Sequence, residues 1–409
     1  MLELRKSTAD NFKLVEGEIS VRRGKIGTKV MKMIRWKHGF KVLGEMGKAM
    51  KDLKLKKRIQ GLWYSPHMAA ASHAISERIQ LVDLIVELRD ARIPLSSECE
   101  ILRNYPASTR NIIALNKMDL ADQSKLQEWM KYFRERNFIS YGVNSHNKEN
   151  IRKFLSLIQN QVRELKRTDH TATVMLVGIP NVGKSALANS LHQIGRTSAA
   201  EKGKLKHATV SPEPGETRDI RSFKIASHPN IYVLDTPGVL PPEILDVDVC
   251  SKLILTGAIK DLIGTKELAQ YFLAILNRSE QYKNWANLSS KDEDMLSLDC
   301  TMEFLNSSES HVKQRRQSPT DHTQDCIVRY VRQTLFETIS AYEGDTNDEE
   351  EMETLISMQF GALQKVFHVS SECPEEANVK VGKKLLDLFR TGRLGHYMLD
   401  LPPGSIHFN

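Results

Sequence analysis

The stretch Gly178-Ile179-Pro180-Asn181-Val182-Gly183-Lys184-Ser185 decides the fold of this chain. It follows an apolar run at 173–177 and precedes a helical-looking segment at 186–191. A strand, a glycine-containing loop and a helix in this order form a phosphate-binding P-loop, in which backbone N–H groups and the positive end of the helix face the phosphates. We therefore expect Lys184 to contact the β- and γ-phosphates and the Ser185 hydroxyl to bind Mg²⁺.

Asn116-Lys117-Met118-Asp119 follows a second apolar run, 112–115, and has the N-K-x-D pattern of guanine-reading loops. A carboxylate at Asp119 can accept hydrogen bonds from guanine N1–H and from the 2-amino group. Adenine lacks these donors and would leave the carboxylate buried and unpaired, so the site discriminates strongly between the bases. Taken alone, the four-letter match is equally consistent with a helix N-terminus that has an aspartate in its first turn.

Two further motifs complete the expected site. Asp235-Thr236-Pro237-Gly238 follows an apolar run at 231–234, so that Asp235 would hold Mg²⁺ and the Gly238 N–H would approach the γ-phosphate. The alternative is an ordinary turn at the end of a strand. Thr217, within Pro214-Gly215-Glu216-Thr217, is the candidate switch threonine that binds Mg²⁺ and senses the γ-phosphate.

The order of the motifs indicates a circular permutation. Small GTPases carry the P-loop first and the guanine motif last, whereas here the guanine motif lies about 60 residues before the P-loop. Cutting the chain elsewhere changes this order without changing the site. Because strands alternate with helices, we expect an α/β P-loop GTPase domain at 63–243 with a mostly parallel sheet and the motif order G4-G5-G1-G2-G3.

The C-terminal part, 244–409, predicts a small all-α domain, because its apolar residues have helical spacing. Two polar stretches interrupt it. One, at about 278–325, is rich in Ser, Asn, Asp and Glu, and the other, at 343–353, is strongly acidic. Both have few apolar residues, so we expect disordered or loosely ordered insertions at these places.

The N-terminal extension, 1–62, holds 17 Lys/Arg and 6 Asp/Glu, while the whole chain has a net charge of +7. A polyanionic partner, either nucleic acid or an anionic membrane, would therefore contact mainly this segment. The extension is consistent with a targeting segment, with an RNA-contacting arm and with a solvated lysine-rich tail. The sequence contains no apolar run of about 18 residues, so we expect no transmembrane segment. The five scattered cysteines favour a reducing compartment.

Together these motifs resemble the circularly permuted GTPases of the bacterial RbgA/YlqF and mitochondrial Mtg1 type, including the plant DAR GTPases. The resemblance covers roughly 63–277 and 327–400. Besides the motifs above, it is carried by Asp90-Ala91-Arg92-Ile93-Pro94, Thr256-Gly257-Ala258-Ile259-Lys260-Asp261 and Gly392-Arg393-Leu394-Gly395. Arg92 in the first of these is expected to be structural, bridging a strand end and a helix.

This resemblance implies a slow GTPase that binds the large ribosomal subunit and its rRNA, is stimulated by ribosomal particles, and acts in mitochondria. Peripheral membrane association, a cytosolic or plastid location, and a role in another organelle's ribosome assembly stay open. A different class of function is a nucleotide-dependent scaffold that binds GTP with little hydrolysis.

The resemblance also implies a catalytic histidine. Ras-like enzymes orient the attacking water with a glutamine after Asp-x-x-Gly, but this chain has Val239 there. The resembling proteins use a histidine near the start of the domain, which aligns with His67 in Trp63-Tyr64-Ser65-Pro66-His67-Met68. Here Ser65-Pro66 replaces the family's Pro-Gly, a departure that bears on the mobility of this loop.

An asparagine at the position of Asn181 accompanies potassium-stimulated hydrolysis in related GTPases, which implies K⁺ at this residue; the alternative is a tolerated polar loop residue. Asn144-Ser145 stands where the family has a guanine-supporting Ser-Ala loop. The expected catalytic residues are His67, Lys184 and Thr217, and the expected Mg²⁺ ligands are Ser185, Thr217 and Asp235. The expected GTP-binding residues are Asn116, Lys117, Asp119, Asn144, Ser145, Gly178, Asn181, Val182, Gly183, Lys184, Ser185 and Gly238.

Overall fold

The computed structural model describes residues 64–402, apart from 106–110, 166–170, 199–218, 243, 245, 261–262, 289–325 and 371–372. Three predictions fall outside these residues: the N-terminal extension 1–62, the candidate switch threonine Thr217, and the polar insertion from 289 onward.

A six-stranded sheet forms the centre of the first half of the chain. Its strands are β1 (Leu84–Asp90), β2 (Asn111–Asn116), β3 (Ile139–Val143), β4 (Ala172–Val177), β5 (Arg221–Ser227) and β6 (Asn230–Asp235). The strand order is β3-β2-β1-β4-β6-β5, and only the β5–β6 pair is antiparallel. The prediction of a mostly parallel α/β sheet is therefore confirmed. All seven residues of β1 are buried, as is typical of a parallel strand covered on both faces.

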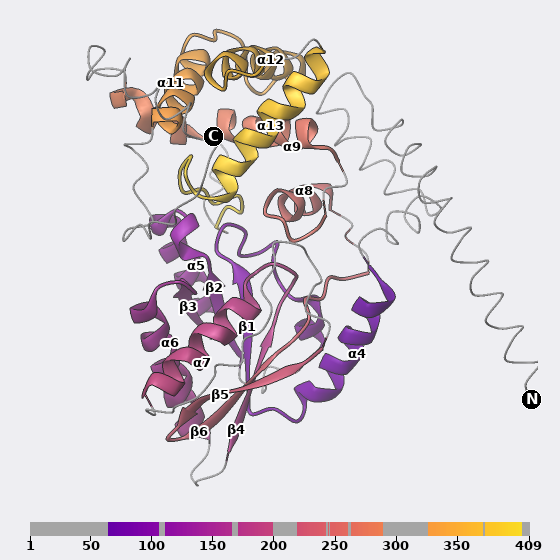
Figure 1. Ribbon diagram of the computed structural model, residues 1–409, viewed down its shortest axis with the longest axis vertical. Coiled ribbons are helices and arrows are strands. Elements are labelled where there is room, and N and C mark those ends of the chain that lie inside the picture. The colour runs from indigo at the N-terminus through magenta and orange to yellow at the C-terminus, as the bar shows by residue number, and fades with distance from the viewer. Residues whose placement is uncertain are drawn as a thin grey trace, which may run out of the picture.

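Helices cover both faces of this sheet (Figure 1). They are α4 (Pro66–Ile79), α5 (Gln123–Glu135), α6 (Lys148–Leu165) and α7 (Lys184–Ser198), with short 3₁₀ turns η1 (Glu100–Asn104) and η2 (Met118–Leu120). Because side chains alternate along a strand, Val86 packs in one core with α6 and α7, while Ile85 packs with α4 on the other face. Helix α5 covers β2 on that second face through Trp129.

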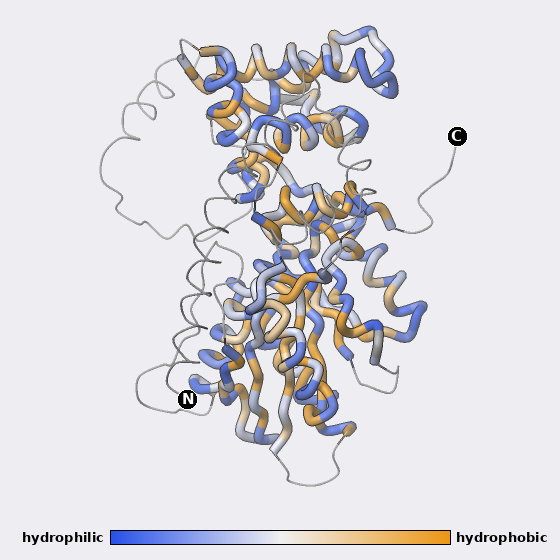
Figure 2. The backbone as a smooth tube through the Cα atoms, turned by 90° about the vertical axis from the view of Figure 1, so that its right-hand side faces the viewer, coloured by the Kyte–Doolittle hydropathy of each residue, from blue (hydrophilic) through white to orange (hydrophobic). Residues whose placement is uncertain are grey.

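The described residues after β6 form helices and 3₁₀ turns only, which confirms the predicted all-α C-terminal region. They are α8 (Val247–Leu255), α9 (Thr265–Arg278), η3 (Glu280–Leu288), α11 (Cys326–Ser340), α12 (Glu349–Val366) and α13 (Pro374–Arg390). Phe272 of α9 and Phe389 of α13 contact each other with ring centroids 4.7 Å apart. In Figure 2 the strands are largely apolar, whereas the covering helices alternate between apolar and polar residues.

These helices lie beyond one end of the sheet (Figure 1). Contacts from Arg92 to Phe389 and to the Thr256 carbonyl identify this end as the one at which β1 finishes. The C-terminal helices therefore border the same sheet edge at which the motif loops begin.

Two sequence predictions are wrong in this region. The acidic stretch 343–353 is not loosely ordered throughout, because α12 begins inside it at Glu349. Asp348 caps this helix by accepting from the backbone N–H of Glu350 and Glu351, and acidic residues in a first turn interact favourably with the helix dipole. The insertion predicted from about 278 also begins later, since η3 follows α9 and buries Trp285.

Candidate nucleotide-binding site

The predicted motifs meet at one edge of the sheet. Asp90, Asn116 and Asp235 are the last residues of β1, β2 and β6, and the P-loop follows directly after β4. These four strands are parallel, so their carboxyl ends lie at the same edge, where open α/β sheets bind ligands. The fold thus brings the guanine motif, the P-loop and the Asp-x-x-Gly motif together, although they lie far apart in the sequence.

Close backbone approach explains the glycines of the P-loop. Gly183 has a φ of 96°, and a Cβ there would lie 2.3 Å from Asn116 Nδ2. Gly238, after β6, lies so close to the loop that a Cβ would be 2.5 Å from Pro180 Cα. The Val239 N–H donates to the Gly178 carbonyl at 3.3 Å, so the Asp-x-x-Gly loop rests directly on the P-loop.

Ser185 and Asp235, two of the expected Mg²⁺ ligands, lie side by side. Ser185 Oγ donates to Asp235 Oδ2 at 2.7 Å, while Asp235 Oδ1 is buried with no hydrogen-bond partner among the described residues. Burial raises the pKa of Asp235, which favours the neutral acid until a cation compensates for its charge. A hydroxyl and a carboxylate are the oxygen donors that Mg²⁺ prefers, so these residues fit this ion.

Lys184 is folded onto its own loop. Its side chain is buried, and Nζ donates to the carbonyls of Gly178 at 3.0 Å and Ile179 at 2.8 Å. Burial lowers the pKa of Lys184 to about 8, against the opposing effect of Asp235. A phosphate in the loop would compensate for the cost of this buried charge better than two neutral carbonyls do.

Asn116 ties the guanine motif to the other loops. Its Nδ2 donates to the Val182 carbonyl at 2.7 Å, and its Oδ1 accepts from Ser145 Oγ at 2.9 Å. The Ser145 carbonyl in turn accepts from Ser190 Oγ of α7 at 2.7 Å. Asn116 and Ser145 therefore hold three loops in register, whereas the Asn144 Oδ1 closes its own turn by accepting from the His146 N–H.

The remaining guanine-motif residues differ in their partners. Lys117 has a left-handed backbone with a φ of 60°, and its Nζ donates to Asp90 Oδ2 at 2.9 Å. Asp119 is half-buried, and its carboxylate makes no hydrogen bond within the described part of the chain. Asp119 is thus available to accept hydrogen bonds from a guanine base.

Asn181 contacts the C-terminal region. Its Nδ2 donates to the Gly257 carbonyl at 2.8 Å, within the Thr256–Asp261 motif quoted above. The amide nitrogen is therefore engaged by α8's following turn, and the predicted K⁺ role of Asn181 stays a prediction.

His67 lies exposed in the first turn of α4. The Ser65-Pro66 departure builds a regular helix start: Ser65 Oγ accepts from the Met68 N–H at 3.2 Å, and Pro66 occupies the first turn. Ile75 of helix α4 belongs to the same hydrophobic cluster as Val239, the residue after Gly238. His67 is therefore carried by a helix that shares a hydrophobic cluster with the Asp-x-x-Gly loop, but its imidazole forms no hydrogen bond or ion pair with the described phosphate-binding residues.

The sequence analysis did not predict that Asp90 contacts Lys117 or that Ser190 contacts the loop at Ser145. Asp90 lies in a quoted signature, but its contact with Lys117 joins residues 27 positions apart. The register of β1 with β2, in which Asp90 pairs with Asn116, places the two motifs side by side. Only a correct strand pairing would have revealed this contact.

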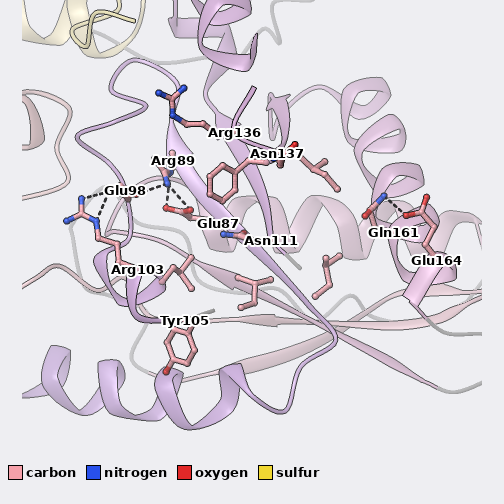
Figure 3. Close-up of a pocket in the computed structure, with 15 residues that line it drawn as sticks. Glu87, Arg89, Glu98, Arg103, Tyr105, Asn111, Arg136, Asn137, Gln161 and Glu164 are labelled. Atoms are coloured by element: carbon pink, nitrogen blue, oxygen red, sulfur yellow. Dashed lines mark hydrogen bonds and ion pairs between the residues drawn. The ribbon is translucent and has the colours of Figure 1, made fainter. Parts of the chain in front are cut away.

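Two cavities of the described structure have no residue of the phosphate-binding loop in their lining. One of about 730 Å³ lies along β1 and is lined by Leu84, Glu87 and Arg89 of that strand. Figure 3 shows its ion pairs, in which Arg89 and Arg103 both contact Glu98. A second cavity of about 420 Å³ lies between α6 and α7 and borders Ser145.

Within the described ranges no helix combines the length and apolar character needed to span a bilayer. The same residues contain no group of three or more His, Cys, Asp or Glu side chains arranged as a metal site. Among the residues that the structure describes, Ser185 and Asp235 are the oxygen donors expected to bind a cation at the P-loop.

The chain is similar to known GTPases of plants and bacteria. The family described as 50S ribosome-binding GTPase matches residues 173–307. DAR GTPase 2, mitochondrial, of Arabidopsis thaliana is 54% identical over 88% of this chain and 95% of that protein. Short integuments 2, mitochondrial, of the same plant is 43% identical over 83% and 89% of the two chains. Ribosome biogenesis GTPase A of Priestia megaterium is 32% identical over 58% of this chain and 81% of the bacterial protein.

Proposed function

Because this chain belongs to the circularly permuted GTPases of the RbgA/YlqF and Mtg1 family, which includes the plant DAR GTPases, we propose that it binds and hydrolyses GTP while assisting assembly of the large ribosomal subunit in mitochondria. The observation that carries this proposal is the Asn116 side chain, which links the guanine motif to the P-loop through Val182 and to Ser145. One side chain thereby fixes the distance between the base and phosphate ends of a nucleotide.

The phosphate end supplies binding and charge stabilisation. Lys184 exchanges its two carbonyl partners for phosphate oxygens, and the exposed N–H groups of the P-loop then face the same oxygens. GTPases of this kind use Mg²⁺, which would be held by Ser185 and Asp235 and would neutralise charge on the β- and γ-phosphates. Thr217 is proposed as a further ligand.

The base end supplies specificity. Asp119 accepts from the guanine N1–H and 2-amino group, and Ser145 supports the loop next to the base. An adenine nucleotide leaves the Asp119 carboxylate unpaired, so we expect a preference for GTP over ATP of at least about a hundredfold.

His67 is the proposed water-orienting residue. Val239 is buried and apolar, so it cannot orient water. Because His67 is exposed in the first turn of α4, we expect that a conformational change brings its imidazole to the γ-phosphate, which supports a slow basal rate and stimulation by ribosomal particles. Potassium at Asn181 is proposed to add positive charge near the phosphates.

The test is hydrolysis of GTP in a single turnover by the full-length protein, with and without large ribosomal subunits. The proposal expects retention of GTP over ATP, a slow basal rate, a faster rate with subunits, and a loss of about a hundredfold in the stimulated rate in His67→Ala. Failure to retain GTP would refute the proposal, and equal rates in Na⁺ and K⁺ would remove the Asn181 part of it.

The capped start of α4 supports a second candidate, a scaffold that binds GTP with little hydrolysis. Its regular N-cap fixes His67 on a helix in place of a mobile glycine loop. If His67→Ala hydrolyses GTP as fast as the unaltered protein in the presence of subunits, the scaffold is favoured. Co-sedimentation with subunits at rising salt separates binding through the basic extension, which falls steeply with salt, from binding through the folded domains.

A further inference from the structure

Asp90 lies between the guanine motif and the C-terminal helices. Its buried Oδ2 accepts from Lys117 Nζ at 2.9 Å and from Arg92 Nη2 at 2.8 Å, and its Oδ1 accepts from the backbone N and the Nε of Arg92, each at 3.0 Å. Burial alone would raise its pKa, but the two neighbouring cations hold the pKa of Asp90 well below its usual range. This carboxylate is therefore a fixed anion shared by two cations.

The contact with Asp90 places Lys117 within the guanine loop. Lys117 has a left-handed backbone, which a non-glycine residue keeps only where its surroundings hold it. The ion pair with Asp90 restrains the Lys117 side chain, which is 26% exposed. The geometry of the loop that precedes Asp119 thus depends on Asp90.

Arg92 extends the same cluster to the C-terminal helices. Its guanidinium carbon lies 5.5 Å from the ring centroid of Phe389, and its carbonyl accepts from the Leu399 N–H at 2.8 Å. Nη1 of Arg92 is buried without a hydrogen-bond partner among the described residues. The side chain is therefore held by Asp90 on one side and by the aromatic face of α13 on the other.

The segment after α13 contacts the neighbouring loops as well. The Asp400 carboxylate accepts from the backbone N–H groups of Leu95 and Ser96 and from Ser96 Oγ, all at 2.8 Å. A Cβ at Gly392 would lie 2.7 Å from Leu120 Cδ2, directly after the guanine motif. Residues 389–400 thus rest on the loop that holds Arg92 and on the turn that holds Asp119.

We propose that Asp90 and Arg92 are positioning residues that couple guanine-nucleotide affinity to the attachment of residues 389–400 on the GTPase domain. The inference rests on the proposed function, because it takes the loop 116–119 as the guanine site. Coupling between two sites is reciprocal. A nucleotide that fixes Lys117 strengthens the attachment of residues 389–400, and loss of that attachment weakens nucleotide binding.

The test is a double-mutant cycle on the full-length protein, with Arg92→Met, Lys117→Met and the double variant, read as the Kd of a fluorescent GDP. Each single change should weaken binding by about tenfold, and the double variant should lose clearly less than the product of the two, because both act through Asp90. Arg103→Met is the matched control: it removes an arginine that pairs with Glu98 but is 60% exposed, and it should change the Kd by less than about twofold. Arg92→Lys, which keeps the charge, should recover part of the lost affinity.

Hydrogen exchange provides the reciprocal measurement. GDP should slow exchange of the Leu95, Ser96 and Leu399 amides about tenfold in the unaltered protein and in Arg103→Met, but by less than about twofold in Arg92→Met. Multiplicative losses in the cycle, or full GDP protection of Leu399 in Arg92→Met, would overturn the inference alone. If Arg92→Met does not fold, Arg92→Lys takes its place, and unaltered affinity with unaltered protection would overturn the inference. Failure of the unaltered protein to bind GDP would overturn the proposed function and this inference together.

Discussion

Two buried aspartates end parallel strands on either side of β4, and their hydrogen-bond partners differ in charge. Asp90 ends β1 and accepts hydrogen bonds from two cationic side chains, Arg92 and Lys117. Asp235 ends β6, accepts from one neutral hydroxyl, and keeps one oxygen without a partner among the described residues. The pKa of Asp90 is lowered and that of Asp235 is raised. Position at a strand end therefore does not decide the role of a carboxylate; its partners do, and of the two only Asp235 keeps an oxygen without a partner among the described residues.

The largest expected effect comes from removing the charge that is already paired. Asp90→Asn leaves the buried Arg92 and the half-buried Lys117 without their anion, so we expect the free energy of unfolding to fall by about 3–5 kcal/mol. Urea unfolding followed by circular dichroism measures this change. Glu149→Gln in α6 is the control, because Glu149 and its partner Lys153 are both exposed, and it should leave the free energy of unfolding almost unchanged. Equal losses in the two variants would contradict the comparison.

Removing the carboxylate of Asp235 should reduce GTP hydrolysis without lowering the free energy of unfolding. Asp235→Asn keeps a side chain able to accept from Ser185 but lowers the affinity for Mg²⁺, so we expect single-turnover GTP hydrolysis to fall by about a hundredfold. We expect its free energy of unfolding without nucleotide to be equal to or higher than that of the unaltered protein, because a buried and poorly paired acid is removed. A destabilisation as large as that of Asp90→Asn would show that Asp235 is paired after all.

The smallest expected effect is a pH dependence from Lys184, whose charge acts on Asp235. Burial lowers its pKa to about 8 without nucleotide, and phosphates raise it, so nucleotide binding takes up a proton above pH 8. The affinity for GDP should accordingly fall as the pH rises from about 8 to 10, by at most about tenfold per pH unit.

The same pKa fixes the sign of the stability change in the nucleotide-free protein. Between pH 8 and the unfolded lysine value the unfolded chain binds more protons, so stability rises with pH in that window. Lys184→Arg stays charged throughout and should flatten both profiles. Fluorescence measurement of the GDP affinity from pH 7 to 10 checks the pH dependence of binding. If the affinity of Lys184→Arg falls with pH as steeply as that of the unaltered protein, the effect belongs to another group.

The sequence predicted the strands that carry the site, because each motif follows an apolar run and the P-loop has its required flanks. It also predicted the parallel sheet and the helical C-terminal region. It did not predict how Asn116 reaches Val182 or how Lys117 reaches Asp90, since both contacts depend on strand register between distant residues. The prediction of loose order for the acidic stretch 343–353 was wrong, because it rested on low hydropathy and did not consider Asp348 as the N-cap of α12.

The attachment of Asp400 to Leu95 and Ser96 has a consequence for biosynthesis. The guanine motif and the P-loop emerge early from a translating ribosome, yet the loop beside them is fastened by a residue made some 300 positions later. A nascent chain stalled before residue 400 would expose two amide groups and an arginine that the finished protein covers. Capture of guanine nucleotide by this enzyme is thus expected to be a late event of its synthesis.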